Sequence, residues 1–151
     1  MKGIYHFEKV SDLLSCAGQP TESQLKQLAE EGYQVIVNIG LLNTKYALPG
    51  EAAIVEALGM DYFHIPVVFE NPEVNELASF TSYMDKCSTK KVLVHCAANY
   101  RASAFIGLYL FSRGVFTEEE MHHFIDDVWQ PNLVWQSFIK DALNNVINDR
   151  A

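Results

Sequence analysis

Two short segments of the sequence, Tyr33–Ile39 and Lys91–His95, carry apolar or β-branched residues at consecutive positions. A strand with one face in solvent alternates apolar and polar residues, whereas these runs are typical of parallel strands buried under helices on both faces. Asp61–Val67, closed by Pro66 near its end, predicts a third strand. The need for helices on both faces of a sheet limits the fold more than any other feature of the sequence.

Helical segments separate these strands and follow them. Thr21 and Gln24 have the spacing of a capping box at the start of a helix, as do Thr117 and Glu120. The other predicted helices are Glu51–Leu58, Pro72–Lys86, Ala102–Arg113 and Asn132–Asn148. The alternation predicts an α/β fold: a single domain over residues 1–151, with a mainly parallel central sheet flanked by helices and with a helical C-terminus.

Composition and charge exclude several classes of partner. The 151 residues include 11 Lys and Arg against 19 Asp and Glu, a formal net charge of −8. Binding to a nucleic acid requires a row of cations that this sequence lacks, so we expect no nucleic-acid partner. No apolar stretch approaches the roughly 20 residues of a membrane span, so we expect no membrane partner either.

The cysteines and the first residues indicate the compartment. Cys16, Cys87 and Cys96 have neither a metal-binding nor a disulfide spacing. The first residues lack the apolar region of a secretory signal. We therefore expect a cytoplasmic protein without a metal or another cofactor, and the sequence does not indicate its oligomeric state.

The chemistry-bearing segment follows the second buried run. The strand ends at His95, Cys96 begins a tight loop, and an apolar helix starts near Arg101. In open parallel sheets, ligands bind beyond the carboxyl ends of the strands. A thiol beside the free N–H groups of a helix N-terminus can have its pKa lowered from about 8.5 to roughly 3.5–7.5. Cys96 is therefore a candidate nucleophile that needs no general base.

The residues after this cysteine form a candidate anion-binding loop. The loop comprises Ala97, Ala98, Asn99, Tyr100 and Arg101. Backbone N–H groups can hold an anion, and the Arg101 guanidinium can bind two of its oxygens at once. A cation in the first turn of a helix opposes the helix dipole unless an anion is present, and Asn99 predicts a positive φ in the loop. These features favour a functional site over the alternative of an inert buried cysteine.

The stretch from Val92 to Arg101 resembles the signature loop of cysteine-dependent tyrosine and dual-specificity phosphatases. Three more stretches are similar, in order and spacing, to one bacterial branch of that superfamily, the phosphatase-like domains found alone or fused to metallo-β-lactamase-type hydrolases. They are Ser15-Cys-Ala-Gly18-Gln19-Pro20, Val35-Ile-Val-Asn38-Ile and His64-Ile-Pro66-Val67. The resemblance implies a phosphatase-like fold in which Cys96 is the nucleophile, Arg101 binds the substrate anion and His95 tunes the thiolate.

The loop departs from the phosphatase pattern at several positions. Phosphatases usually place five residues between the Cys and the Arg, but only four separate Cys96 from Arg101, which removes one amide from the cradle. A four-residue gap is also used by rhodanese-type sulfurtransferases, in which the Cys carries a persulfide. Asn99 replaces the usual Gly, and the hydroxyl that often follows the Arg is replaced by Ala102, with Ser103 one place later.

The loop that usually carries the general acid also departs from the phosphatase pattern. Dual-specificity phosphatases protonate the leaving oxygen with an Asp on the loop after the Ile-Pro-Val strand, and residues 67–72 contain no Asp here. Glu70 is the only carboxylate in that loop and is our candidate acid; the alternative is a solvated glutamate just before a helix.

Four other residues attract attention. His122 and His123 are adjacent on an acidic helix and point to different faces, which favours a solvated surface over a metal site. His64 is expected to be a hydrogen-bonded structural histidine. The resemblance puts Cys16 on a loop near the site, where it is either a resolving thiol or a passive buried cysteine.

Three functions remain open from the sequence. The leading hypothesis is a cysteine-dependent phosphatase that forms a thiophosphate intermediate and acts on a small phosphorylated substrate. The second is a sulfurtransferase in which Cys96 carries a persulfide and Arg101 holds thiosulfate or a persulfide donor. The third is an anion-binding module without catalysis. The acidic balance of the chain favours a small anionic partner in each case.

Overall fold

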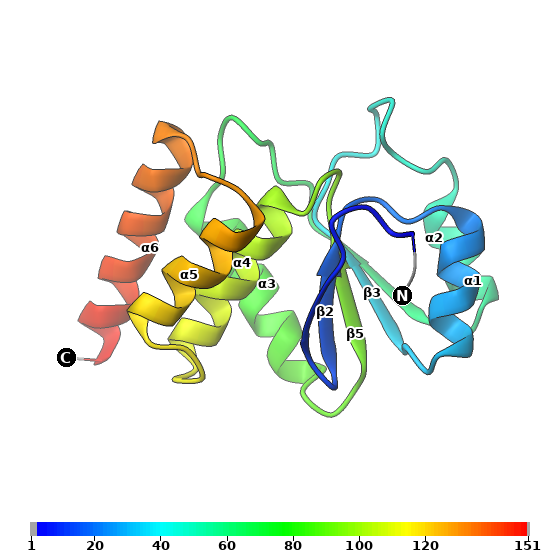
Figure 1. The fold of residues 1–151 in the computed structure, drawn as a ribbon, viewed down its shortest axis with the longest axis horizontal. Coiled ribbons are helices and arrows are strands. Elements are labelled where there is room, and N and C mark those ends of the chain that lie inside the picture. The colour runs from blue at the N-terminus through cyan, green and yellow to red at the C-terminus, as the bar shows by residue number, and fades with distance from the viewer. Residues whose placement is uncertain (1–2, 151) are drawn as a thin grey trace.

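Strands and helices alternate along the chain, as the sequence predicts (Figure 1). The structure is a computed structural model that describes residues 3–150. Its elements are β1 (Glu8–Ser11), β2 (Leu14–Ala17), α1 (Glu22–Glu30), β3 (Val35–Asn38), α2 (Glu51–Ala57), β4 (Asp61–His64), α3 (Val74–Lys86), β5 (Val92–His95), α4 (Tyr100–Ser112), α5 (Glu118–Val128) and α6 (Leu133–Arg150).

The strands form a mainly parallel sheet with the order β1-β2-β5-β3-β4. Strand β5 lies at its centre and pairs in parallel with β2 on one side and with β3 on the other. Strand β4 extends the parallel part beyond β3, and β1 pairs with β2 in the antiparallel direction at the opposite edge. The α/β fold with a mainly parallel sheet is therefore confirmed.

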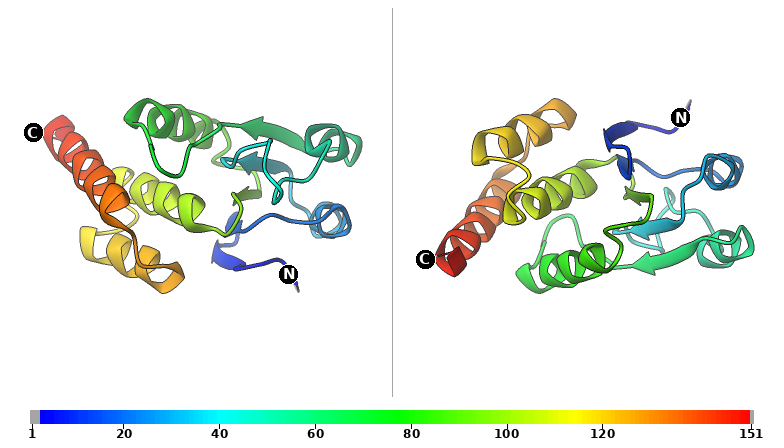
Figure 2. Two further views of the ribbon diagram at one scale, coloured as in Figure 1. Left: turned by 90° about the horizontal axis from the view of Figure 1, so that it is seen from above. Right: turned by 90° about the horizontal axis from the view of Figure 1, so that it is seen from below.

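Helices cover both faces of this sheet, as strands without a polar face require. Helices α1 and α2 lie on one face, and α3 and α4 lie on the other, with α5 and α6 packed outside α4 (Figures 1 and 2). The expected helical C-terminus is therefore the outermost layer on the α4 side. None of the helices in residues 3–150 is long and apolar enough to cross a membrane.

The pleat of β5 sends its side chains alternately to the two faces. Val92 and Val94 belong to the core on the α3–α4 side, whereas Leu93 belongs to the smaller core under α1 and α2. Because side chains alternate along a strand, His95 faces the α1–α2 side, and Cys96 returns to the α4 side. The strand therefore sends these two neighbours to opposite faces of the sheet.

Local capping signals set most helix starts. Both predicted capping boxes are present: the N–H of Gln24 donates to the Thr21 hydroxyl at 3.1 Å, and that of Glu120 donates to the Thr117 hydroxyl at 3.1 Å. The helix expected from Ala102 begins two residues earlier, at Tyr100. The helix expected from Pro72 begins at Val74.

The sequence did not indicate strands β1 and β2, and the placement of Cys16 on a loop was wrong. Cys16 is a fully buried residue of β2, where it pairs with Val94 of β5. Strand β2 has only four residues and contains Ser15, Cys16 and Ala17, which have little strand preference of their own. Pairing with the central strand holds this segment in the sheet.

Two buried tryptophans anchor the segment that follows β4. Trp129 and Trp135 flank the break between α5 and α6, and Trp135 is fully buried. The Trp135 indole N–H donates to the Phe69 carbonyl at 2.7 Å. The outer helical layer thus fixes the 65–73 segment, which borders the candidate site.

Candidate active site

The loop after β5 is held by contacts with the segment that follows β2. The N–H of Cys96 donates to the Ala17 carbonyl at 3.3 Å, and the N–H of Gln19 donates to the Ala97 carbonyl at 3.0 Å. Gly18 and Ala98 form an isolated bridge beside them. The parallel pairing of β2 with β5 therefore extends past the strand ends and fixes the first residues of the loop.

Asn99 turns this loop into helix α4. Its φ of 70° confirms the left-handed conformation expected from the sequence, which Asn tolerates better than other residues with a side chain. The buried side-chain amide donates to the His6 carbonyl at 2.9 Å and to Cys16 Sγ at 3.4 Å. Because α4 begins at Tyr100, only four positions after Cys96, the first N–H groups of the helix follow the loop closely and have no acceptors in the helix itself.

Arg101 is a buried cation at the start of helix α4. The residue is only 9% exposed, and its Nη1 donates to the Val67 carbonyl at 2.7 Å. The guanidinium carbon lies 6.0 Å from the centre of the Phe69 ring. Within residues 3–148, whose side chains the structure describes, no Asp or Glu forms an ion pair with it. Buried charges are normally paired, so this guanidinium is available for an anion from outside the chain.

Cys16 has the properties of a passive buried thiol. Burial raises its pKa to about 12, although the hydrogen bond from Asn99 opposes this shift. A thiol with such a pKa is almost entirely protonated near neutral pH and is a poor nucleophile. This argues against a resolving thiol and for a passive buried cysteine at this position.

The structure places Glu70 on the loop that contacts Arg101. Glu70 is exposed and lies in a turn closed by a 3.0 Å hydrogen bond from the N–H of Asn71 to the Val68 carbonyl. Its neighbours in sequence, Val67 and Phe69, are the residues that contact the guanidinium. Its carboxylate forms no ion pair with any residue that the structure describes.

Three further residues from the sequence analysis make contacts within the fold: Ser103, Tyr100 and His64. Ser103 is buried, but its hydroxyl donates to the Tyr100 carbonyl of its own helix at 3.1 Å. The ring of Tyr100 stacks on that of Trp129 at 4.8 Å between centroids. His64 makes the expected structural hydrogen bond, with Nε2 2.7 Å from the Gly40 carbonyl oxygen.

Glu51 is the residue that the sequence did not single out. It is the first residue of α2, is 3% exposed, and lies with Oε2 2.7 Å from Nε2 of the fully buried His95. Burial disfavours its ionisation, but hydrogen bonds from His95 and Gln19 outweigh burial and lower its pKa. A glutamate at a helix start is usually solvated, so only the folded structure distinguishes this one from its neighbours.

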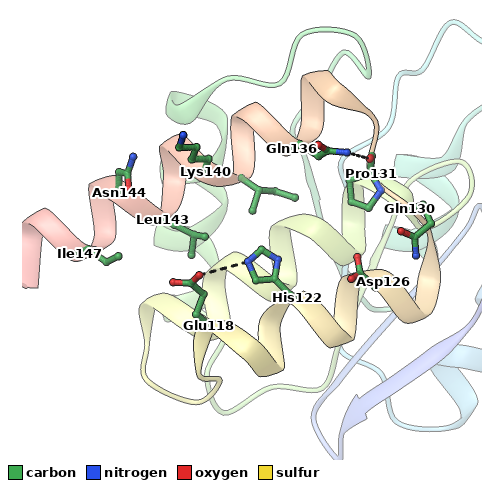
Figure 3. A pocket seen from close by; sticks show the side chains of 11 residues that line it. Glu118, His122, Asp126, Gln130, Pro131, Gln136, Lys140, Leu143, Asn144 and Ile147 are labelled. Carbon is green, nitrogen blue, oxygen red and sulfur yellow. Dashed lines mark hydrogen bonds and ion pairs between the residues drawn. The ribbon is translucent and has the colours of Figure 1, made fainter.

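His122 and His123 belong to the surface of α5. They lie 3.7 Å and 3.8 Å from carboxylate oxygens of Glu118 and Glu119, one turn earlier in the helix. Figure 3 shows His122 and Glu118 at a pocket of about 440 Å³ lined by α5, α6 and the segment between them. No cluster of three or more potential metal ligands occurs among residues 3–150.

The central strand of the mainly parallel sheet leads through a Cys-x4-Arg loop into the buried helix α4. A family model described as the DSP-PTPase phosphatase fused to NAD+ kinase matches residues 7–133. The chain belongs to this family. The comparison with curated proteins gives no match.

Solved structures of the same fold agree with this assignment. A DUF442 protein from Shewanella putrefaciens CN-32, described as a candidate phosphatase, is 34% identical with a TM-score of 0.88, and the match covers 96% of this chain and 95% of that one. PTPMT1, solved in complex with PI(5)P, is 14% identical with a TM-score of 0.81 over 96% of this chain and 99% of that one. The second similarity shows the fold, and the superfamily expected from the sequence is confirmed.

Replacement of Arg101 by Ala is expected to abolish stabilisation by phosphate. At a phosphate concentration 100 times its Kd, the unsubstituted protein should gain about 2.7 kcal/mol in the free energy of unfolding. Urea denaturation with and without phosphate measures the gain. Arg113→Ala is the matched control, because Arg113 lies at the other end of α4 and is paired with Asp85. Equal stabilisation of the two variants would contradict the assignment of the anion site.

Proposed function

We propose that this protein is a cysteine-dependent phosphatase for a small phosphorylated substrate. The observation that carries the proposal is the buried Arg101 guanidinium, which has no carboxylate partner in residues 3–148 and lies five positions after Cys96. A dianionic phosphate group supplies the missing charge and presents oxygens to the forked donor. The family and its phosphatase relatives support the same reaction class.

The proposed reaction has two displacement steps. Cys96 attacks phosphorus as a thiolate, an S–P bond forms, and the P–O bond to the leaving group breaks. Water then attacks the thiophosphate, which releases inorganic phosphate and returns the thiolate. Arg101 and the N–H groups of residues 97–101 hold the equatorial oxygens in both steps, since positioning and charge stabilisation dominate phosphoryl transfer.

Glu70 is the proposed acid for the leaving oxygen. Its turn is tied to Arg101 through Val67 and Phe69, so the carboxylate and the guanidinium belong to one local unit. The anchoring of Phe69 by Trp135 holds that unit in place.

A sulfurtransferase is the second candidate function. The four residues between Cys96 and Arg101 are the observation that favours it, because this gap is the one found in rhodanese-type loops. In that reaction the Cys96 thiolate accepts a sulfane sulfur from thiosulfate, sulfite leaves, and the persulfide passes the sulfur to an acceptor such as cyanide.

The wild-type protein is expected to release phosphate from p-nitrophenyl phosphate and to form no thiocyanate from thiosulfate and cyanide. Nitrophenolate is a good leaving group, so turnover of this ester does not depend on an acid. Cys96→Ser should abolish phosphate release because it removes the thiolate, whereas the matched Cys87→Ser variant should retain it. Initial rates with both substrates provide the measurement.

Each other result changes the proposal. Thiocyanate without phosphate would replace the phosphatase with the sulfurtransferase. Turnover that survives Cys96→Ser would remove Cys96 as the nucleophile. No turnover of either substrate by a folded protein that binds phosphate would leave an anion-binding module.

Replacement of Glu70 by Gln is expected to separate good leaving groups from poor ones. If Glu70 donates a proton, the variant should turn over an alkyl phosphate about 10²-fold more slowly, with little change for p-nitrophenyl phosphate. The ratio of kcat/KM values for the two esters measures the effect, and the aryl ester serves as the internal control. Equal slowing of both esters, or of neither, would exclude Glu70 from the reaction.

A further inference from the structure

The buried carboxylate of Glu51 lies on the opposite face of the sheet from Cys96. It is close to the loop that begins at Cys96, which we call the nucleophile loop. The alternation along β5 points His95 toward α2, where it meets Glu51 at 2.7 Å (Figure 1 shows α2 beside the sheet). His95 is fully buried and Glu51 is 3% exposed. Water therefore has little access to this pair, and protein groups must satisfy its charges.

Gln19 connects this carboxylate to the far side of the loop. Its side-chain amide donates to Oε1 of Glu51 at 2.5 Å, and its backbone N–H donates to the Ala97 carbonyl at 3.0 Å. His95 connects the same carboxylate to the near side of the loop, because its Nδ1 lies 3.3 Å from the Cys96 carbonyl oxygen. Glu51 thus joins two residues that each bond to a carbonyl of the nucleophile loop: His95 to that of Cys96 and Gln19 to that of Ala97.

The hydrogen-bond partners of His95 set its charge. Nε2 faces a carboxylate oxygen and Nδ1 faces a carbonyl oxygen, and both of these atoms accept hydrogen bonds only. Each ring nitrogen therefore needs a proton to make its contact, which defines the imidazolium form. The ionised carboxylate is the counter-charge that allows a cation to remain in a fully buried position.

Two other titratable groups face Glu51 from β4, and neither replaces His95. The carboxylate is among the groups that raise the pKa of Tyr62 to about 12, after burial itself, so this phenol stays neutral. The phenol oxygen accepts a hydrogen bond from the Asn38 side chain at 3.0 Å. His64 bonds to the Gly40 carbonyl and is the last of the groups that lower the pKa of Glu51. His95 is therefore the cation that touches both the carboxylate and the loop.

We propose that Glu51 is a positioning residue for the nucleophile: through His95 and Gln19 it fixes the Cys96–Ala97 backbone and keeps a positive charge next to Cys96. The inference rests on the proposed function, in which Cys96 reacts as a thiolate. A buried ion pair often stabilises a fold no more than well-packed apolar residues of the same size, so stability alone does not explain its presence here. A positive charge that contacts the Cys96 carbonyl gives the pair a role at the nucleophile.

Replacement of Glu51 by Gln should shift the reactivity of Cys96 to higher pH. The amide keeps an acceptor for Nε2 but removes the counter-charge, so His95 loses its proton and the thiolate loses a neighbouring cation. We expect the midpoint of the pH profile for alkylation of Cys96 by iodoacetamide to rise by about 1 pH unit. Peptide mass spectrometry resolves Cys96 from the other cysteines.

The matched control is Glu56→Gln, which removes the same charge from an exposed position of the same helix. Its alkylation profile should coincide with that of the unsubstituted protein. A Glu51→Gln profile that also coincides would overturn the proposal. Because alkylation requires no phosphatase turnover, this result is independent of whether p-nitrophenyl phosphate is a substrate.

A second measurement needs no variant and covers the case in which Glu51→Gln does not fold. Nitrogen NMR of the histidine-labelled, unsubstituted protein at neutral pH should show both ring nitrogens of His95 protonated. A neutral tautomer of His95 would overturn the proposal, because the buried cation beside Cys96 would then be absent. Assignment of the signal by comparison with His95→Asn identifies the residue.

Discussion

The parallel pairing of β5 with β2 and β3 is the interaction on which the candidate site depends. It fixes the end of the central strand, and the bonds from Cys96 to Ala17 and from Gln19 to Ala97 continue that register into the loop. The pleat then sends two adjacent residues to opposite faces. Cys96 lies in the core on the α4 side, while His95 contacts the Glu51 carboxylate of α2.

Two basic side chains next to the candidate nucleophile have different partners. His95 contacts the buried Glu51 carboxylate inside the fold. Arg101 contacts a carbonyl and an aromatic ring, which supports the proposed binding of an anion from outside. The outer helices contribute as well, because Trp135 anchors the loop that carries the Arg101 contacts. The proposed anion site thus lies in a chain whose net charge is acidic overall.

Much of this arrangement could be predicted from short-range signals. The two fully apolar strands, the capping boxes at Thr21 and Thr117, and the left-handed Asn99 each follow from a few neighbouring residues. Strands β1 and β2 could not be predicted, since their pairing partners lie far away in sequence. The role proposed for Glu51 depends likewise on a partner 44 residues away, so no local pattern marks it.

The most direct test of the account is to trap the intermediate on Cys96. Wild-type protein is mixed with p-nitrophenyl phosphate, quenched in acid during turnover and digested for peptide mass spectrometry. The account predicts one phosphoryl group on the peptide that contains Cys96, and none on that peptide from the Cys96→Ser protein. Phosphate release without a phosphoryl group on Cys96, or with the group on another residue, would contradict it.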